Sequence, residues 1–109
     1  MASGIIEKLS NDSANNYCKF PDGTAIARGA VLFPSSSTAG SVTMSVSFPM
    51  IFSAAPTVIM TWRDSNATPS YCGALNARDI TASGYTADAR YNQGGYGWRA
   101  EYIAVGRWK

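Results

Sequence analysis

Residues 41–49 alternate strictly between polar and apolar side chains. Val42, Met44, Val46 and Phe48 fall on one face of an extended chain, and serine or threonine fills the other face. An alternation of period two is typical of a strand with one buried face. The pattern therefore predicts a half-buried β-strand that ends at the following proline.

Further segments have the composition of strands and are separated by turn signals. These segments are residues 17–20, 25–33, 57–62, 71–77, 85–91 and 96–108. The segment 57–62 is apolar on both faces, which predicts a central position in its sheet. Pro21–Thr24 has the composition of a turn with positive φ at its glycine, so the segments on either side are expected to form a hairpin.

The last two segments predict a closing hairpin whose loop spans Asn92–Tyr96. No segment shows sustained 3.6-residue periodicity with helix caps, and short strands recur between turns. We therefore expect an all-β fold, an antiparallel β-sandwich of about six to eight strands. Residues 1–15 are polar and weakly patterned and predict an amino-terminal arm or linker, while residues 16–109 are expected to form the sandwich domain.

The composition of the chain argues against nucleic acid as a partner and against membrane insertion. The chain has 109 residues, of which 46% are hydrophobic and only 15% are charged. Its net charge of +2 and the lack of a Lys/Arg run argue against a nucleic-acid partner. No signal peptide is recognisable, and no apolar stretch approaches the ~20 residues of a membrane helix, so we expect no membrane insertion.

The titratable side chains argue against catalysis. The sequence contains no histidine, which removes the commonest general base, and its seven Asp and Glu residues are scattered without a spacing that indicates a pair. We expect no enzymatic activity and no cofactor. Cys18 and Cys72 are the two cysteines, and without histidine or a Cys-x-x-Cys pair a metal site is not expected. They either form a disulfide or serve as small apolar thiols.

Three landmarks follow one another along the chain. They are Tyr17–Thr24 with its Pro-Asp-Gly turn, Val46–Val58 with its two prolines, and Ile80–Ala89 followed by Tyr102–Trp108. In order and spacing they resemble the C-terminal domains of phage tail fibres, and the second and third also resemble H-type lectins. The resemblance implies an H-type-lectin-like sandwich that assembles as a homotrimer in a virion. It also implies that the strand 102–105 turns one face to the core and the other to sister subunits.

The same resemblance points to the loop between the last two strands as a sugar site. This region offers Tyr91, Asn92, Gln93 and Tyr96, and Tyr71 begins a preceding strand. The lectins carry an aromatic residue, a histidine and an arginine at positions that fall near Asn92, Gln93 and a cysteine here, so their sugar specificity is not implied. The amides can donate to and accept from hydroxyl groups, and tyrosine rings can cover the apolar side of a sugar. A solvated turn with tyrosines packed at its base is the alternative.

A second candidate site is the loop that begins with Trp62, Arg63 and Asp64. Arg63 is a candidate clamp for a carboxylate or phosphate of an acidic glycan. The alternative is an ordinary surface loop in which Trp62 belongs to the core.

The resemblance thus favours a non-catalytic receptor-binding tip domain of a phage tail fibre or a related contractile particle. Its expected receptor is a bacterial surface polysaccharide or lipopolysaccharide. Two alternatives stay open: a structural trimerisation cap without a ligand, and a cellular H-type lectin, for which a disulfide is expected.

Overall fold

The computed structural model describes residues 7–8, 15–36, 40–63, 72–91 and 96–109. The strands in this part of the chain are β1 (Glu7–Lys8), β2 (Asn16–Lys19), β3 (Thr24–Ser36), β4 (Gly40–Ser47), β5 (Thr57–Trp62), β6 (Cys72–Arg78), β7 (Gly84–Tyr91) and β8 (Tyr96–Arg107). Among these residues there is no helix with the length and hydropathy needed to cross a membrane.

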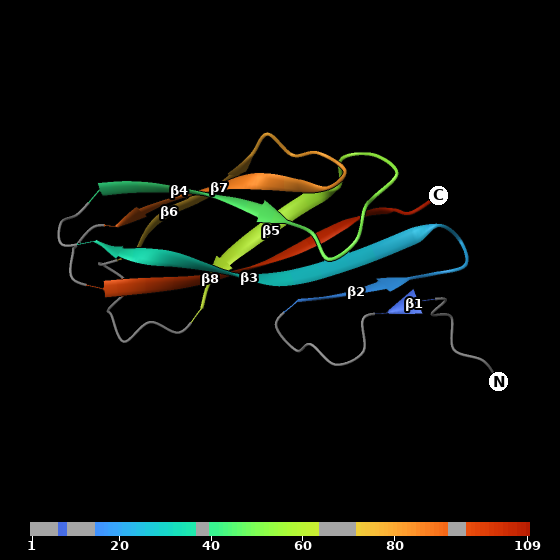
Figure 1. The fold of residues 1–109 in the computed structure, drawn as a ribbon, viewed down its shortest axis with the longest axis horizontal. Coiled ribbons are helices and arrows are strands. Elements are labelled where there is room, and N and C mark those ends of the chain that lie inside the picture. Colours follow the sequence, from blue (N-terminus) through green and yellow to red (C-terminus); the bar gives the residue numbers. More distant parts are fainter. Residues whose placement is uncertain (1–6, 9–14, 37–39, 64–71, 92–95) are drawn as a thin grey trace.

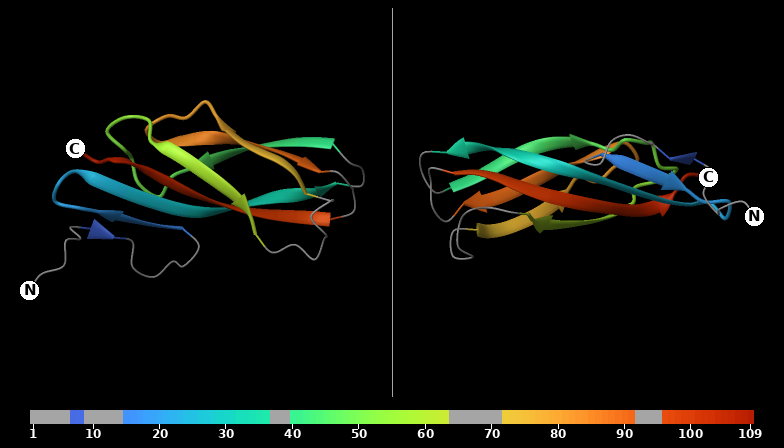
Figure 2. Two further views of the ribbon diagram at one scale, coloured as in Figure 1. Left: turned by 180° about the vertical axis from the view of Figure 1, so that it is seen from behind. Right: turned by 90° about the horizontal axis from the view of Figure 1, so that it is seen from below.

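The strands form two antiparallel sheets that face each other as a sandwich (Figure 1). The five-stranded sheet has the order β1-β2-β3-β8-β5, and the three-stranded sheet has the order β4-β7-β6. β3 and β8 pair along most of their length, from Thr24 opposite Arg107 to Ser36 opposite Tyr96, and lie side by side in Figure 2. The predicted all-β antiparallel sandwich is therefore confirmed.

β4 has the burial pattern that its sequence predicts. Val42, Met44 and Val46 are half-buried against the core, Phe48 just beyond the strand is buried, and the serine and threonine side chains between them are exposed. The period-two alternation thus identifies the core-facing side of this strand correctly.

Aromatic rings from both sheets meet in the middle of the sandwich. Phe48 packs against Phe52, Tyr85 and Tyr102, with ring centroids 5.3, 5.7 and 5.7 Å away. The strands around these rings carry small buried residues, namely Ala25, Ala27, Ala87, Ala89, Ala100 and Ala104. Because alanine occupies little of the space between the sheets, the large rings fill it, in edge-on and offset contacts.

The turn between β2 and β3 is also confirmed. Gly23 has a φ of 98°, which glycine adopts without the steric penalty of a side chain. The Asp22 carboxylate accepts a hydrogen bond of 2.8 Å from the Thr24 backbone N–H, and β2 then pairs with β3 as a hairpin. The residues of this turn therefore determine how β2 pairs with β3.

The predicted closing hairpin is wrong. β7 pairs with β4 and β6 in the three-stranded sheet, whereas β8 pairs with β3 and β5 in the five-stranded sheet. The chain thus passes from one sheet to the other between these consecutive strands. Side-chain alternation shows which face of a strand is buried but does not identify the strand that pairs with it.

Two further expectations differ from the structure. β5 pairs with β8 alone among the described strands, so it lies at an edge of its sheet and not in the centre. The strand looked apolar on both faces in the sequence because Ile59, whose side chain is exposed, falls on the face away from the core. A two-residue strand, β1, pairs with β2 and was not predicted from the sequence.

Candidate functional site

The ends of several strands meet at one end of the sandwich, called here the loop end. At this end Tyr91 pairs with both Gly40 and Cys72, and Tyr96 pairs with Ser36. β5 finishes there as well, at Trp62 opposite Ala100 on β8. The short strand β1 and the carboxyl terminus lie toward the opposite end (Figure 1). Segments far apart in the sequence therefore border the same end.

The predicted sugar-site residues lie at or beyond these strand ends. Tyr91 and Tyr96 are terminal residues of β7 and β8, and the backbone of Tyr91 lies opposite that of Cys72. The side chains of both tyrosines lie outside the described part of the structure. Four other predicted site residues lie wholly outside it, namely Asp64, Tyr71, Asn92 and Gln93. Their role in binding stays a prediction.

Trp62 has a packing role. Its indole Nε1 donates a hydrogen bond of 2.8 Å to the Gly73 carbonyl, which links β5 to the other sheet. Its ring lies 5.9 Å from that of Phe33, and the side chain is half-buried beside the core. These contacts agree with the alternative in which Trp62 belongs to the core.

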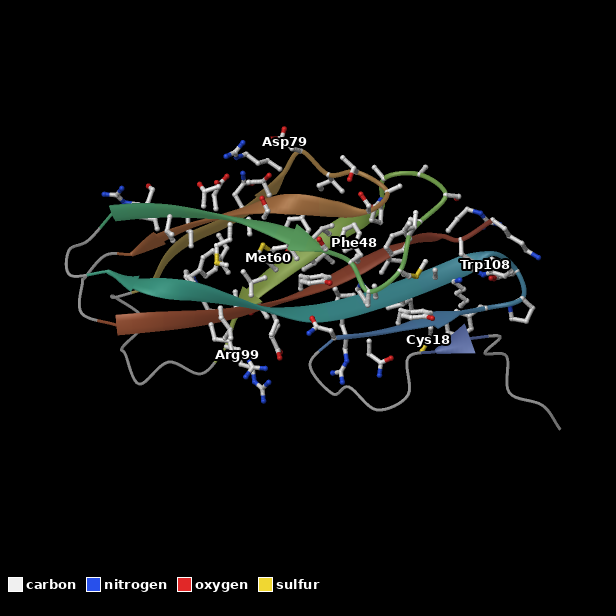
Figure 3. All side chains as sticks on the ribbon, viewed as in Figure 1. Cys18, Phe48, Met60, Asp79, Arg99 and Trp108 are labelled. Carbon is white, nitrogen blue, oxygen red and sulfur yellow. The ribbon has the colours of Figure 1, made fainter. Side chains whose placement is uncertain are left out.

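Arg63 lies on the surface in an ionic cluster that sequence reasoning missed. Its Nη1 donates to Glu101 Oε1 at 2.8 Å, and Nη2 of Arg99 lies 3.5 Å from the same oxygen. Arg99 points away from the core residues Phe48 and Met60 (Figure 3). The spacing Arg99–Ala100–Glu101 places both charged side chains on one face of β8, and this is the signal available in the sequence.

The outer face of the five-stranded sheet carries an apolar patch formed by Ile26, Ile59, Ile103 and Val105. Ile26 lies opposite Val105 in the register, and Ile59 lies opposite Ile103. All four side chains are exposed in the single chain. A cavity of about 150 Å³ opens beside the patch and is lined by Arg28, Ile59, Thr61, Glu101 and Ile103, together with the neighbouring residues Gly29, Met60 and Tyr102.

The outer face of the three-stranded sheet is polar. Asp88 on β7 accepts a hydrogen bond of 2.8 Å from Thr43 on β4 and one of 2.7 Å from Arg78 Nε on β6. The hydrogen bond from Arg78, and after it the one from Thr43, hold the pKa of the Asp88 carboxyl below its ordinary value of 3.8. The same pairing raises the pKa of Arg78. The two outer faces of the sandwich thus differ in chemistry.

Two tyrosines bury their hydroxyl groups between the sheets. Tyr85 and Tyr102 are 4% and 1% exposed, and within the described residues neither hydroxyl has a hydrogen-bond partner. Burial raises the pKa of Tyr102 to about 12 and also raises that of Tyr85. Cys18, on β2, is a half-buried free thiol.

Searches with the sequence found no matching family model and no similar curated protein. Comparison of the fold with solved structures does find similar chains. An N-truncated R1-type pyocin tail fibre aligns with a TM-score of 0.71 and 18% identity over 93% of this chain and 86% of that chain. A C-terminal segment of the P. aeruginosa R1 pyocin fibre aligns with a TM-score of 0.72 and 19% identity.

The tailspike protein gp49 from Pseudomonas phage LKA1 aligns with a TM-score of 0.65 and 24% identity over 80% of this chain. The chain spans 28% of the R1 pyocin fibre segment and 16% of the tailspike chain. At such low identities the likeness is one of fold, and function has to be argued from the surfaces and the site. The fold of this chain is thus the one found in these pyocin tail fibres and in part of a phage tailspike.

Proposed function

We propose that this chain is a non-catalytic receptor-binding tip domain of a phage tail fibre or pyocin-like particle. It acts as a homotrimer in the particle and recognises a bacterial surface polysaccharide or lipopolysaccharide. The observation that carries the proposal is the contrast between the two outer faces of a sandwich that shares its fold with pyocin tail fibres. One face exposes the apolar patch, and the other exposes hydroxyl and charged groups.

The apolar patch supports assembly. Four large apolar side chains gathered on one sheet face are unfavourable in water, and a second copy of the same face removes them from it. Identical copies around one axis present the same patch to one another. The expectation that β8 turns its second face to sister subunits therefore becomes part of the proposal.

The loop end supports receptor binding. It lies opposite β1, the first described strand, so an amino-terminal arm joined to a fibre shaft leaves the loop end pointing away from the particle. Asn92 and Gln93 between β7 and β8 supply amides for sugar hydroxyl groups. Several copies per particle increase the effective affinity of a weak single site.

Binding of the purified chain to host cells and to a glycan array tests this function. Asn92→Ala combined with Gln93→Ala is expected to abolish binding while the assembly keeps its mass. Ser45→Ala combined with Ser47→Ala, at exposed positions of the three-stranded sheet, is the control and is expected to bind normally. Unchanged binding of the loop variant contradicts the site. A wild-type chain that assembles but binds no cell and no glycan instead favours a structural trimerisation cap.

A further inference from the structure

The end of β8 is bound to the turn between β2 and β3. The indole Nε1 of Trp108 donates a hydrogen bond of 2.7 Å to the Phe20 carbonyl, and the backbone N–H of Trp108 donates one of 2.9 Å to the Gly23 carbonyl. Nη2 of Arg107 donates one of 2.7 Å to the Asp22 carbonyl. Figure 3 shows Trp108 beside this turn. We call these five residues the turn latch.

The turn latch is closely packed and has further attachments. Gly23 is buried, and a Cβ atom there would overlap the Arg107 guanidinium group. The Arg107 carbonyl accepts hydrogen bonds of 2.7 and 3.1 Å from the backbone N–H and the hydroxyl group of Ser53. The ammonium group of Lys19 on β2 lies 5.7 Å from the centre of the Trp108 ring, within the range of a cation–π contact. The turn latch therefore connects β2 and its turn to β8 and to the segment between β4 and β5.

The order of the pairings along the chain gives the turn latch a particular position. β1 pairs with β2 through two residues, and β2 pairs with β3 through four. The turn follows β2, and β3 then pairs with β8 from Thr24 opposite Arg107 onward. Tension from the amino-terminal side of the chain therefore reaches β1 and β2 first, the turn latch next, and the pairing of β3 with β8 last. Short pairings with few hydrogen bonds open at a lower free energy than the core of a domain.

We propose that the turn latch is a mechanical clamp that confines unfolding under tension to β1 and β2. This role rests on the proposed function, because it takes the amino-terminal arm as the connection to a fibre shaft. The hydrogen bonds of the latch join consecutive residues of β8 and its end to the turn, so they have to break before tension reaches β3. β3 and β8 carry buried core residues and most of the apolar patch. The clamp thus keeps the sandwich folded when the arm is pulled.

Force spectroscopy of the full chain tests the clamp. One tether is attached to the amino terminus, and the other to a click-reactive residue in place of Ser45, which is exposed on β4. The wild type is expected to open in two steps. The first step releases at most about 45 Å of chain, the extended length of residues 7–19. The second step unfolds the sandwich at a higher force.

Arg107→Gln combined with Trp108→Phe removes the two side-chain donors of the turn latch. We expect this double variant to lose the intermediate between the two steps, so that opening of β1 and β2 continues directly into complete unfolding. Trp108→Phe alone is expected to shorten the lifetime of the intermediate about tenfold, since one hydrogen bond is lost. Circular dichroism checks that each variant is folded, and the single variant tests the clamp where the double variant does not fold.

Arg63→Gln combined with Trp62→Phe is the matched control. The same two residue types lie at the end of β5, where the Trp62 indole also donates a hydrogen bond to a backbone carbonyl, that of Gly73. This pair lies outside the part of the chain between the arm and the turn. The control is expected to keep both steps and to lower only the force of the second. A wild type that unfolds in one step, or equal lifetimes of the intermediate in the wild type and the latch variants, overturns the proposal.

The failure of the clamp is distinguishable from the failure of the proposed function. The pulling measurement uses purified protein without cells or glycan arrays. A chain that binds host cells but opens in one step overturns the clamp alone. A chain that opens in two steps but binds no cell and no glycan overturns the receptor-binding function alone.

Discussion

Ile59 of β5 lies directly opposite Ile103 of β8, and both side chains point out of the sandwich, 63% and 49% exposed. Cross-strand apolar pairs normally stabilise a sheet by covering each other and packing on a core. This pair faces away from the core and adjoins Ile26 and Val105. The proposed trimer gives these side chains a partner surface.

Placing a charge in this patch is expected to prevent assembly. Ile103→Asp buries an uncompensated carboxylate in the proposed interface, at a cost of about 3–5 kcal/mol, which corresponds to more than a hundredfold in the association constant. Light scattering over a concentration series measures the loss. Ser41→Asp adds the same charge at an exposed position of the other sheet and is expected to assemble normally. Equal behaviour of the two variants argues against the patch as the interface.

Gly84 is expected to tolerate no side chain. A Cβ atom there would overlap the Val46 carbonyl oxygen of the neighbouring strand, and both partners are backbone with little freedom to shift. Gly84→Ala should lower the free energy of unfolding by about 1–3 kcal/mol. Gly40→Ala, where a Cβ meets open space, should change it by less than about 0.5 kcal/mol. Urea denaturation of both variants checks this, and similar midpoints contradict it.

The elements of the fold could be predicted better than their pairing. The alternation in β4 and the Pro21–Gly23 turn depend on neighbouring residues, so the strand, its buried face and the first hairpin were predicted correctly. The closing hairpin was not, because the assignment of β7 and β8 to different sheets depends on pairings with distant strands. An outward-facing Ile59 made an edge strand resemble a central one.

Asp88 makes the stability of the folded state depend on pH in the acid range. Its hydrogen bonds with Arg78 and Thr43 lower the pKa in the folded state, so their stabilising effect is present above the ordinary value of 3.8 and is lost as the pH falls through the folded pKa. Asp88→Asn removes this contribution. The thermal midpoint of the variant should therefore fall less between about pH 5 and pH 2 than that of the wild type. Parallel curves for the two proteins contradict this account.

The buried tyrosines make the stability of the folded state depend on pH in the alkaline range. A raised pKa in the folded state means that stability is complete below the ordinary value of 10 and declines as the pH rises toward about 12, the value for Tyr102. Tyr102→Phe removes a buried hydroxyl that has no partner among the described residues, so at neutral pH it should be neutral or stabilising, by up to about 1 kcal/mol. Thermal unfolding from about pH 8 to pH 11 should show a shallower decline for the variant. An unchanged decline rules out this role for Tyr102.

The candidate site was predicted only in part. Sequence reasoning offered Arg63 as a candidate clamp for an anion, which stays a prediction, and it did not place Arg99 and Glu101 beside it. That placement depends on the register of β5 on β8, in which Thr61 lies opposite Glu101. Trp62 was a candidate for binding, and the structure uses its indole to link the two sheets. Sequence alone gives the charge of a strand position but not its neighbours across the sheet.

The central claim is that this chain works as a trimeric tip whose apolar patch is covered by its own copies. Light scattering of the purified chain coupled to size-exclusion chromatography tests it most directly. The account predicts a particle with three times the 11.6 kDa mass of the chain. A monomer at all concentrations would contradict it, because the apolar patch would then stay exposed to water and no subunit boundary would exist.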